Sequence, residues 1–250
     1  MKVFQVCGFH QTGKTTTVSA LIQRFKASGN MVASLKDIHF EGFQLEQPNK
    51  NTYVHRQAGA DLVVARGKQE TDFMYSRQFS LPEIASLITA DWLVVEGMNH
   101  FPLPKIVCGK TEAEVDRFLD RRTFAIAGII GERLTDYRGL RVFNPLNAES
   151  ANELWALATR VVFPMLPYVE DDCCRLCGLT CRELVEAIVQ GEKSYHDCTI
   201  NETNVHLKIG GIQIPIVPFV QRVLKNNVLA VVNELKGWQA GKPIEVLIDR

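Results

Sequence analysis

The sequence predicts an α/β protein in which a mostly parallel β-sheet is covered by helices. Three observations lead to this class. Apolar runs of strand length alternate with segments of helical periodicity through the first two thirds of the chain. A glycine-rich loop connects the first apolar run to the first helical segment. Five of the seven cysteines crowd into residues 173–198, which predicts an additional small α+β unit built around them.

The first elements are a strand and a helix. Residues 3–7 form a short apolar run of the kind that lies inside a parallel sheet. Residues 16–27 place apolar side chains at helical spacing, and Ser28-Gly29-Asn30 then supplies a stop signal. The same reasoning predicts further strands at 31–35, 62–65, 73–75, 91–97 and 124–130, and helices at 81–89 and 152–161.

A second unit follows a proline-rich stretch at residues 164–168, which has the composition of a linker. We therefore expect a nucleotide-binding domain at residues 1–168 and a cysteine-cluster domain at residues 169–250. The second domain is predicted to contain a helix at 182–190, a hairpin at 205–214 around Gly210-Gly211, a helix at 219–235 and a closing strand at 244–248.

Composition excludes several classes of partner. The 28 basic and 28 acidic side chains cancel, so no overall field attracts nucleic acid or an anionic membrane, and neither is expected as a partner. No apolar run approaches the roughly 20 residues that a membrane-spanning helix needs. The glycine-rich loop starts at residue 8, which leaves no room for a signal peptide, and a cytoplasmic location is expected.

The glycine-rich loop reads Gly8-Phe9-His10-Gln11-Thr12-Gly13-Lys14-Thr15, which matches the phosphate-binding pattern G-x-x-x-x-G-K-T. In this pattern backbone N–H groups surround a phosphate, Lys14 reaches the β- and γ-phosphates, and the Thr15 hydroxyl can ligate Mg²⁺. The alternative is a glycine-rich turn that binds nothing. The predicted class is thus a P-loop nucleoside triphosphatase, and the predicted nucleotide-binding residues are Gly8, Phe9, His10, Gln11, Thr12, Gly13, Lys14, Thr15 and Thr16.

Two carboxylates complete the predicted nucleotide site. Glu96 ends the apolar run 91–97, where P-loop proteins keep an acid that holds Mg²⁺ or orients water. Asp37 lies in a polar loop after the run 31–35, and the carboxyl ends of parallel strands meet at one edge. We expect Lys14, Asp37 and Glu96 to carry any hydrolysis, and Thr15 and Glu96 to hold Mg²⁺. The alternative is that Glu96 merely ends a strand at the surface.

The cysteines predict a metal centre. Cys174, Cys177, Cys181 and Cys198 place three thiols within eight residues and a fourth after one helix. Four sulfurs suit a [4Fe–4S] cluster or a tetrahedral zinc ion, and common zinc ribbons instead pair their ligands as two separated C-x₂-C knuckles. Iron–sulfur is favoured, zinc and uncoordinated thiols stay open, and Cys173 could replace Cys174. Cys7, at a strand end, is expected to be a buried core thiol.

The first 130 to 160 residues resemble the MobB family of molybdopterin-guanine dinucleotide biosynthesis. The resemblance is carried by the phosphate loop and by four further segments: 36–40, 48–52, 55–60 and 94–97 followed by Pro104-Lys105-Ile106. It implies a homodimer that binds GTP and associates with the guanylyltransferase that attaches GMP to molybdopterin. The segment 174–198 likewise resembles four-cysteine [4Fe–4S] domains of corrinoid and electron-transfer proteins.

Together these features predict a GTP-binding accessory protein of molybdenum or tungsten cofactor maturation, with an iron–sulfur domain that senses redox state or docks a partner. Such a protein is expected to be at most a slow GTPase. Guanine rests on the resemblance, because the base-reading motif Asn-Lys-x-Asp is not evident. The alternatives are an ATPase that drives electron transfer or metallocentre assembly, and a zinc-stapled binding module with an idle phosphate loop.

Overall fold

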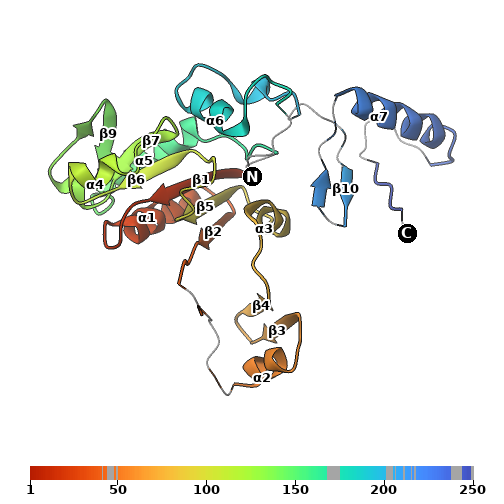
Figure 1. The fold of residues 1–250 in the computed structure, drawn as a ribbon, viewed down its shortest axis with the longest axis horizontal. Helices are drawn as coiled ribbons and strands as arrows, with labels where there is room; N and C mark the ends of the chain where they lie inside the picture. Colours follow the sequence, from red (N-terminus) through yellow and green to blue (C-terminus); the bar gives the residue numbers. More distant parts are fainter. Residues whose placement is uncertain are drawn as a thin grey trace.

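The computed structural model describes residues 1–40, 42–43, 48, 50–167, 175–200, 205, 207–210, 212–214, 216, 218–237 and 244–248. Its centre is a seven-stranded sheet with the order β2-β5-β1-β6-β7-β9-β8 (Figure 1). Every neighbouring pair is parallel except β8–β9, so the predicted α/β class is confirmed. The strands are β1 Lys2–Cys7, β2 Val32–Lys36, β5 Trp92–Glu96, β6 Lys105–Cys108, β7 Thr123–Ala127, β8 Asp136–Tyr137 and β9 Leu140–Phe143.

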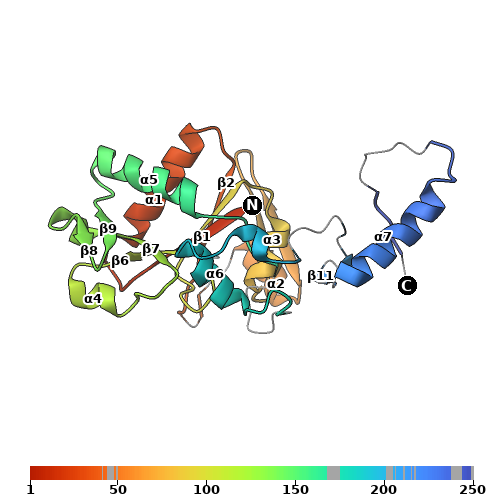
Figure 2. The same ribbon diagram turned by 90° about the horizontal axis from the view of Figure 1, so that it is seen from above.

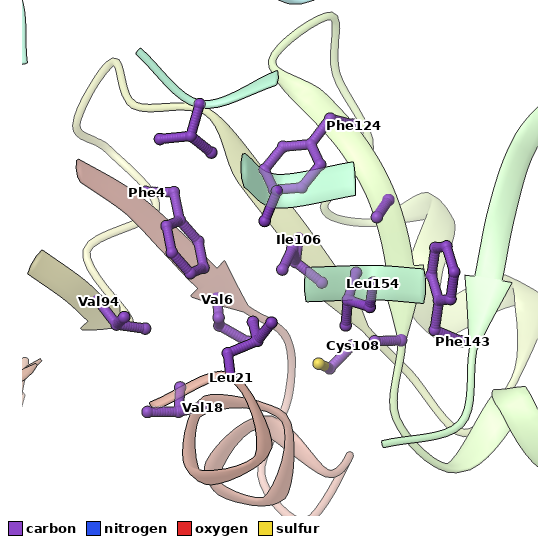
Figure 3. Close-up of a cluster of buried hydrophobic side chains, with 14 of the residues drawn as sticks. Phe4, Val6, Val18, Leu21, Val94, Ile106, Cys108, Phe124, Phe143 and Leu154 are labelled. Atoms are coloured by element: carbon purple, nitrogen blue, oxygen red, sulfur yellow. The ribbon is translucent and has the colours of Figure 1, made fainter. Parts of the chain in front are cut away.

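Helices cover the sheet because its strands are apolar on both faces. Helix α1 (Lys14–Ala27) and helix α5 (Ala148–Val161) pack on one face, where their side chains meet those of β1, β6 and β7 in the main core cluster (Figure 3). On the opposite face, Leu81 of helix α3 (Leu81–Leu87) packs against Leu93 and Val95 of β5. A capping box at Ser80 starts α3 as its sequence predicts. A short helix α4 (Glu112–Asp116) precedes β7.

A small excursion leaves the sheet between β2 and α3. It contains helix α2 (Asn51–Gln57) and the antiparallel strands β3 (Leu62–Arg66) and β4 (Thr71–Tyr75), which pair with each other (Figure 1). Both strands were predicted. The two-stranded sheet that they form is separate from the seven-stranded one.

The region after residue 163 contains helix α6 (Cys181–Val189), the 3₁₀ turn η2 (Tyr195–Asp197), the hairpin strands β10 (Leu207–Ile209) and β11 (Ile212–Ile214), and helix α7 (Pro218–Val232). The predicted helices and hairpin are therefore present. Figure 2 shows α6 against the sheet and α7 set apart from it. None of the helices in the described part of the chain combines the length and apolar character needed to cross a membrane.

Two expectations for this region fail in part. The closing strand at 244–248 is wrong, because these residues are exposed and, among the described residues, pair with no other strand that could accept and donate their backbone hydrogen bonds. The stretch 164–167 is packed rather than an exposed linker: Pro164 forms a β-bridge with Lys2, the Met165 N–H donates to the Met1 carbonyl, and Leu166 is buried. The boundary at residue 168 stays a prediction.

Candidate functional site

The phosphate loop lies at the carboxyl edge of the sheet, between β1 and α1. Its path requires left-handed backbone at Gln11, with a φ of 57°, and at Gly13, with a φ of 94°. Gly13 is the residue before the first turn of α1, so Lys14 and Thr15 begin the helix at its positive end. The motif therefore folds into the strand–loop–helix arrangement in which such loops hold phosphate.

Two glycines let the loop approach neighbouring strands closely. A Cβ on Gly8 would come within 2.1 Å of the Cys108 carbonyl oxygen at the end of β6, and a Cβ on Gly128 would come within 2.1 Å of the Thr12 carbonyl oxygen. Gly128 was not predicted as a site residue. The preceding strand was predicted to extend to residue 130. In the structure β7 ends at Ala127, because Gly128 adopts a φ of 94°.

Hydrogen bonds inside the loop bring its lysine inward. The Lys14 ammonium donates to the Phe9 carbonyl at 2.5 Å, and the Thr12 hydroxyl donates to the same oxygen at 2.9 Å. The side chains of Phe9, His10 and Gln11 are exposed, and the Phe9 ring lies edge-on to Phe118.

Glu96 meets the phosphate loop directly. It ends β5, its side chain is largely buried, and its two carboxylate oxygens accept the Thr15 hydroxyl at 3.1 and 3.0 Å. The Lys36 ammonium lies 3.2 Å from the same carboxylate. Lys36 was not predicted as a site residue. Its place at the end of β2, the strand beside β5, could have indicated that it lies near Glu96. The arrangement joins a hydroxyl, a carboxylate and an ammonium at the start of α1.

Asp37 lies at the same edge but faces a different partner. Its backbone N–H donates to the Glu96 carbonyl at 2.9 Å, which holds the ends of β2 and β5 together. Its carboxylate lies 3.1 Å from His39 Nε2. The structure thus brings Thr15 and Glu96 together with Lys36, and it leaves the Lys14 ammonium on the Phe9 carbonyl. Asp37 lies beside Glu96 with its side chain turned to His39.

Two buried thiols lie under the loop. Burial raises the pKa of Cys7 to about 11 and the pKa of Cys108 to about 12. The Cys7 thiol lies 3.4 Å from the Gly97 carbonyl oxygen, and Cys108 Sγ lies 3.5 Å from the Thr17 hydroxyl. Both are neutral packing residues, as predicted for Cys7.

The cysteine region has its own apolar cluster. Cys181 and Cys198 are buried in it together with Phe163, Leu166 and Leu184, and Cys177 packs against it half-buried. Cys181 is the first residue of α6, directly after a capping box in which Thr180 and Glu183 exchange hydrogen bonds. A helix N-terminus favours a thiolate there.

The predicted ligand set is only partly described. Cys173 and Cys174 lie outside the described residues. Within the described ranges, no group of three or more His, Cys, Asp or Glu side chains is arranged to hold a metal ion. The structure therefore gathers three of the predicted sulfurs in one apolar cluster without forming a complete site from them.

Two family models match the chain. Residues 3–131 match the MobB model, described as "Molybdopterin guanine dinucleotide synthesis protein B". Residues 172–200 match a model described as "Putative Fe-S cluster". The first match covers the phosphate loop, Asp37 and Glu96, and the second covers the cysteines 173–198.

Curated relatives agree with these matches. A protein of Methanocaldococcus jannaschii, named "Putative molybdopterin-guanine dinucleotide biosynthesis adapter protein", is 27% identical over 256 residues that span all of this chain and 98% of the relative. A Bacillus subtilis protein, named "Probable molybdopterin-guanine dinucleotide biosynthesis adapter protein", is 26% identical over 147 residues, which are 57% of this chain and 84% of the relative.

Solved structures share the fold of the first part. A crystal structure of Bacillus subtilis MobB aligns with a TM-score of 0.53 and 24% identity, covering 63% of this chain and 98% of that one. A second Bacillus subtilis MobB structure aligns with a TM-score of 0.50 and 22% identity, covering 63% and 97%. Residues 172–200 resemble the family described as "Putative Fe-S cluster". Since the MobB model alone matches more than half of the chain, this protein belongs to the MobB family.

Proposed function

We propose that this protein is a GTP-binding adapter in molybdopterin-guanine dinucleotide biosynthesis that carries an iron–sulfur cluster. The single observation that carries the nucleotide part is the contact of the Thr15 hydroxyl with both oxygens of Glu96. A hydroxyl on the first turn of α1 and a carboxylate at the end of the strand beside β1 in the sheet are the pair of oxygens that bind or orient Mg²⁺ beside a nucleotide. The curated relatives, named as adapter proteins, support the biosynthetic role.

In this proposal the loop residues 8–16 bind the phosphates through their N–H groups, and Lys14 turns from the Phe9 carbonyl to the β- and γ-phosphates. Hard oxygen donors fit a magnesium ion, so Thr15 and Glu96 would hold it, and Mg²⁺ would neutralise phosphate charge. Asp37, next to Glu96 and paired with His39, would orient water. Any hydrolysis would be slow unless a partner adds positive charge to the transition state.

Cys174, Cys177, Cys181 and Cys198 would hold a [4Fe–4S] cluster. The support is the chemistry of the described donors: three sulfurs associated with one apolar cluster, one of them at a helix N-terminus. A zinc ion would use the same thiolates. Iron, sulfide and zinc content, measured with an absorption spectrum on protein purified without oxygen, separates the two: about four irons and four sulfides per chain support the cluster, and one zinc without a visible band contradicts it.

The partner side of the proposal is an association with the guanylyltransferase that joins GMP to molybdopterin, made by a homodimer of this chain. Mixing the two proteins with GTP and following their masses by light scattering tests both statements. A complex of a dimer with the transferase is expected, and a monomer that binds no transferase contradicts them.

The nucleotide part is tested by substituting Thr15 in two ways. Thr15→Ser keeps the hydroxyl that contacts Glu96, whereas Thr15→Val removes the hydroxyl at nearly constant shape. GTP titrations with and without Mg²⁺ are expected to show a magnesium-dependent gain in affinity for the wild type and the serine variant and its loss in the valine variant. Equal magnesium dependence in all three proteins would overturn the assignment, and tighter binding of ATP than of GTP would overturn the choice of nucleotide.

A further inference from the structure

Residues 97–104 run from the carboxyl end of β5 to the amino end of β6, and we call this segment the strap. Its first residue, Gly97, follows Glu96 at the nucleotide edge. A Cβ on Gly97 would lie 3.1 Å from the Cβ of Asp37, so Gly97 packs closely against the backbone and Cβ of Asp37, the second predicted acid. Its carbonyl oxygen is contacted by the Cys7 thiol just before the phosphate loop. The beginning of the strap is thus part of the nucleotide site.

The strap turns through strained backbone immediately after Glu96. Gly97 has a φ of 102°, and Met98, which has a Cβ, has a left-handed φ of 54°. Left-handed backbone at a residue other than glycine persists only where its surroundings hold it. The side chains of Met98, Phe101 and Leu103 are buried together against β5, and this packing supplies part of that restraint.

Buried polar side chains add to this restraint. Arg122 is 3% exposed and donates to the carbonyl oxygens of Phe101 and Asn99. Lys105 is 1% exposed and donates to the Asn99 side chain at 3.1 Å and to Asp120 at 2.8 Å. A buried guanidinium and a buried ammonium are costly to leave unpaired, so their bonds fix the middle of the strap.

One further contact to the strap comes from the cysteine region. Arg182 donates to the His100 carbonyl at 2.7 Å, and it is the neighbour of Cys181 in the first turn of α6. The other end of α6 is held by a bond from Gln190 to the Arg121 carbonyl, just before β7, so α6 lies at the amino edge of the sheet, away from the phosphate loop (Figures 1 and 2). The strap therefore touches the nucleotide site at one end and α6 in its middle.

We propose that Arg182 is a positioning residue that links the occupancy of the cysteine cluster to nucleotide affinity through the strap. This inference rests on the proposed function, because it assumes a nucleotide at the loop and a metal centre at the cysteines. Ligation of Cys181 fixes the first turn of α6 and with it the guanidinium of Arg182. The bond to His100 then holds the strained turn at Gly97 and Met98, which fixes Glu96 and Asp37 for magnesium and nucleotide.

The test compares GTP affinity in two forms of the full chain: protein purified without oxygen, which carries its metal centre, and the same protein after the metal is removed with a chelator. The loaded wild type is expected to bind GTP with Mg²⁺ at least about fivefold more tightly than the metal-free form, the lower end of typical coupling between sites. Arg182→Ala is expected to bring the two affinities to within about twofold of each other, because little coupling remains without the bond.

The matched control is Arg121→Ala. The Arg121 guanidinium forms an ion pair with Glu192 across the same interface, and in the described part of the chain its side chain makes no hydrogen bond to the strap, so the control is expected to retain the wild-type difference. A second readout is metal retention: since coupling is reciprocal, GTP should slow the loss of visible absorbance to a chelator in the wild type and not in Arg182→Ala. Melting curves of both variants show whether α6 stays docked.

The possible results separate this inference from the proposed function. Absence of GTP binding in both forms of the wild type overturns the proposed function and removes the basis for coupling. GTP binding with the same affinity in loaded and metal-free protein overturns the role of Arg182 and leaves the proposed function standing. Equal loss of coupling in Arg182→Ala and Arg121→Ala also overturns that role, because it would assign the effect to general docking of α6.

Discussion

Replacing Gly128 by alanine tests whether the phosphate loop depends on a residue far from it in sequence. Gly128 follows β7, and a Cβ there would come within 2.1 Å of the Thr12 carbonyl oxygen and 3.4 Å of Cys108 Cβ. Its φ of 94° and ψ of −153° belong to a region that residues with a side chain almost never adopt. The new methyl group therefore meets backbone, which cannot move aside as a flexible side chain could.

The expected cost has two parts. The backbone conformation costs about 1–3 kcal/mol for a residue with a Cβ. The overlap with Thr12 adds about 1–3 kcal/mol, the usual cost of overpacking. For a chain of this size each kcal/mol lowers the melting temperature by about 2–4 °C, so a decrease of roughly 4–24 °C is expected. Because the displaced oxygen belongs to the phosphate loop, GTP affinity should fall as well.

Gly139→Ala is the matched control. Gly139 has a φ of 77°, and a Cβ there would meet nothing within 4 Å, so this variant suffers backbone strain without overlap. Gly139→Ala is expected to be more stable than Gly128→Ala by roughly 1–3 kcal/mol, the cost of the overlap that it lacks, and therefore to melt closer to the wild type. It is expected to bind GTP like the wild type. Thermal melting and GTP titration of both variants measure the difference. If Gly128→Ala has the same melting temperature as Gly139→Ala and binds GTP like the wild type, the close packing of the phosphate loop on the residue after β7 is refuted.

Three further predictions concern charge and titration. Glu96→Gln keeps an acceptor but removes the charge, so GTP affinity measured with Mg²⁺ should fall by about 10- to 100-fold, the usual worth of a charged hydrogen bond. Lys105→Met should lower the free energy of unfolding, measured by urea titration, by about 1–2 kcal/mol. The value is small because the partner of Lys105, Asp120, is one-third exposed. Burial raises the pKa of Asp120, but bonds from Arg122 and Lys105 outweigh this and hold it below 3.8. That stabilisation is present above pH 3.8 and is lost as the pH falls through the lower folded value, so the wild type and Lys105→Met should converge in acid. Burial raises the pKa of Cys108 to about 12, so its thiol should resist alkylation at about pH 8 in the native protein and react in urea, as mass spectrometry would show.

Controls and contradicting outcomes differ among these three. Glu149→Gln removes an exposed carboxylate from the first turn of α5 and should leave magnesium dependence unchanged; equal behaviour of Glu96→Gln would mean that this acid does not serve the metal. Lys26→Met, at the exposed end of α1, should cost little stability, and a persistent gap for Lys105→Met in acid would argue against the ion pair with Asp120. Rapid native labelling of Cys108 would contradict its burial.

Local sequence patterns predicted most elements of the main sheet and the two long helices that cover it. The strand–loop–helix arrangement around residues 8–15 was also predicted, because the motif acts through local backbone geometry. Glu96 was predicted to lie near the loop because neighbouring parallel strands end at one edge. These features depend on spacing within short segments, which the sequence displays directly.

Features that depend on strand order were missed. Gly128 comes close to the phosphate loop because β7 lies two strands from β1 in the sheet. Lys36 reaches Glu96 because β2 is the neighbour of β5. The strap showed only an apolar, proline-containing stretch, since its restraint comes from Arg122 and Lys105 through the tertiary fold. The strand predicted at 244–248 failed for the opposite reason: its apolar residues fit a strand, but a strand also needs a neighbour, which local pattern does not supply.

The most direct test of the central claim, that one chain carries a GTP site and a metal centre, is a paired measurement on Lys14→Ala. GTP affinity with Mg²⁺ and iron content are measured on the same samples of wild type and variant, purified without oxygen. Lys14→Ala is expected to lose GTP affinity by at least about 10-fold, as follows from loss of a charged contact to phosphate, and to keep the iron of the wild type. Undiminished GTP binding by Lys14→Ala, loss of its iron, or a wild type that lacks either GTP binding or iron would contradict this claim.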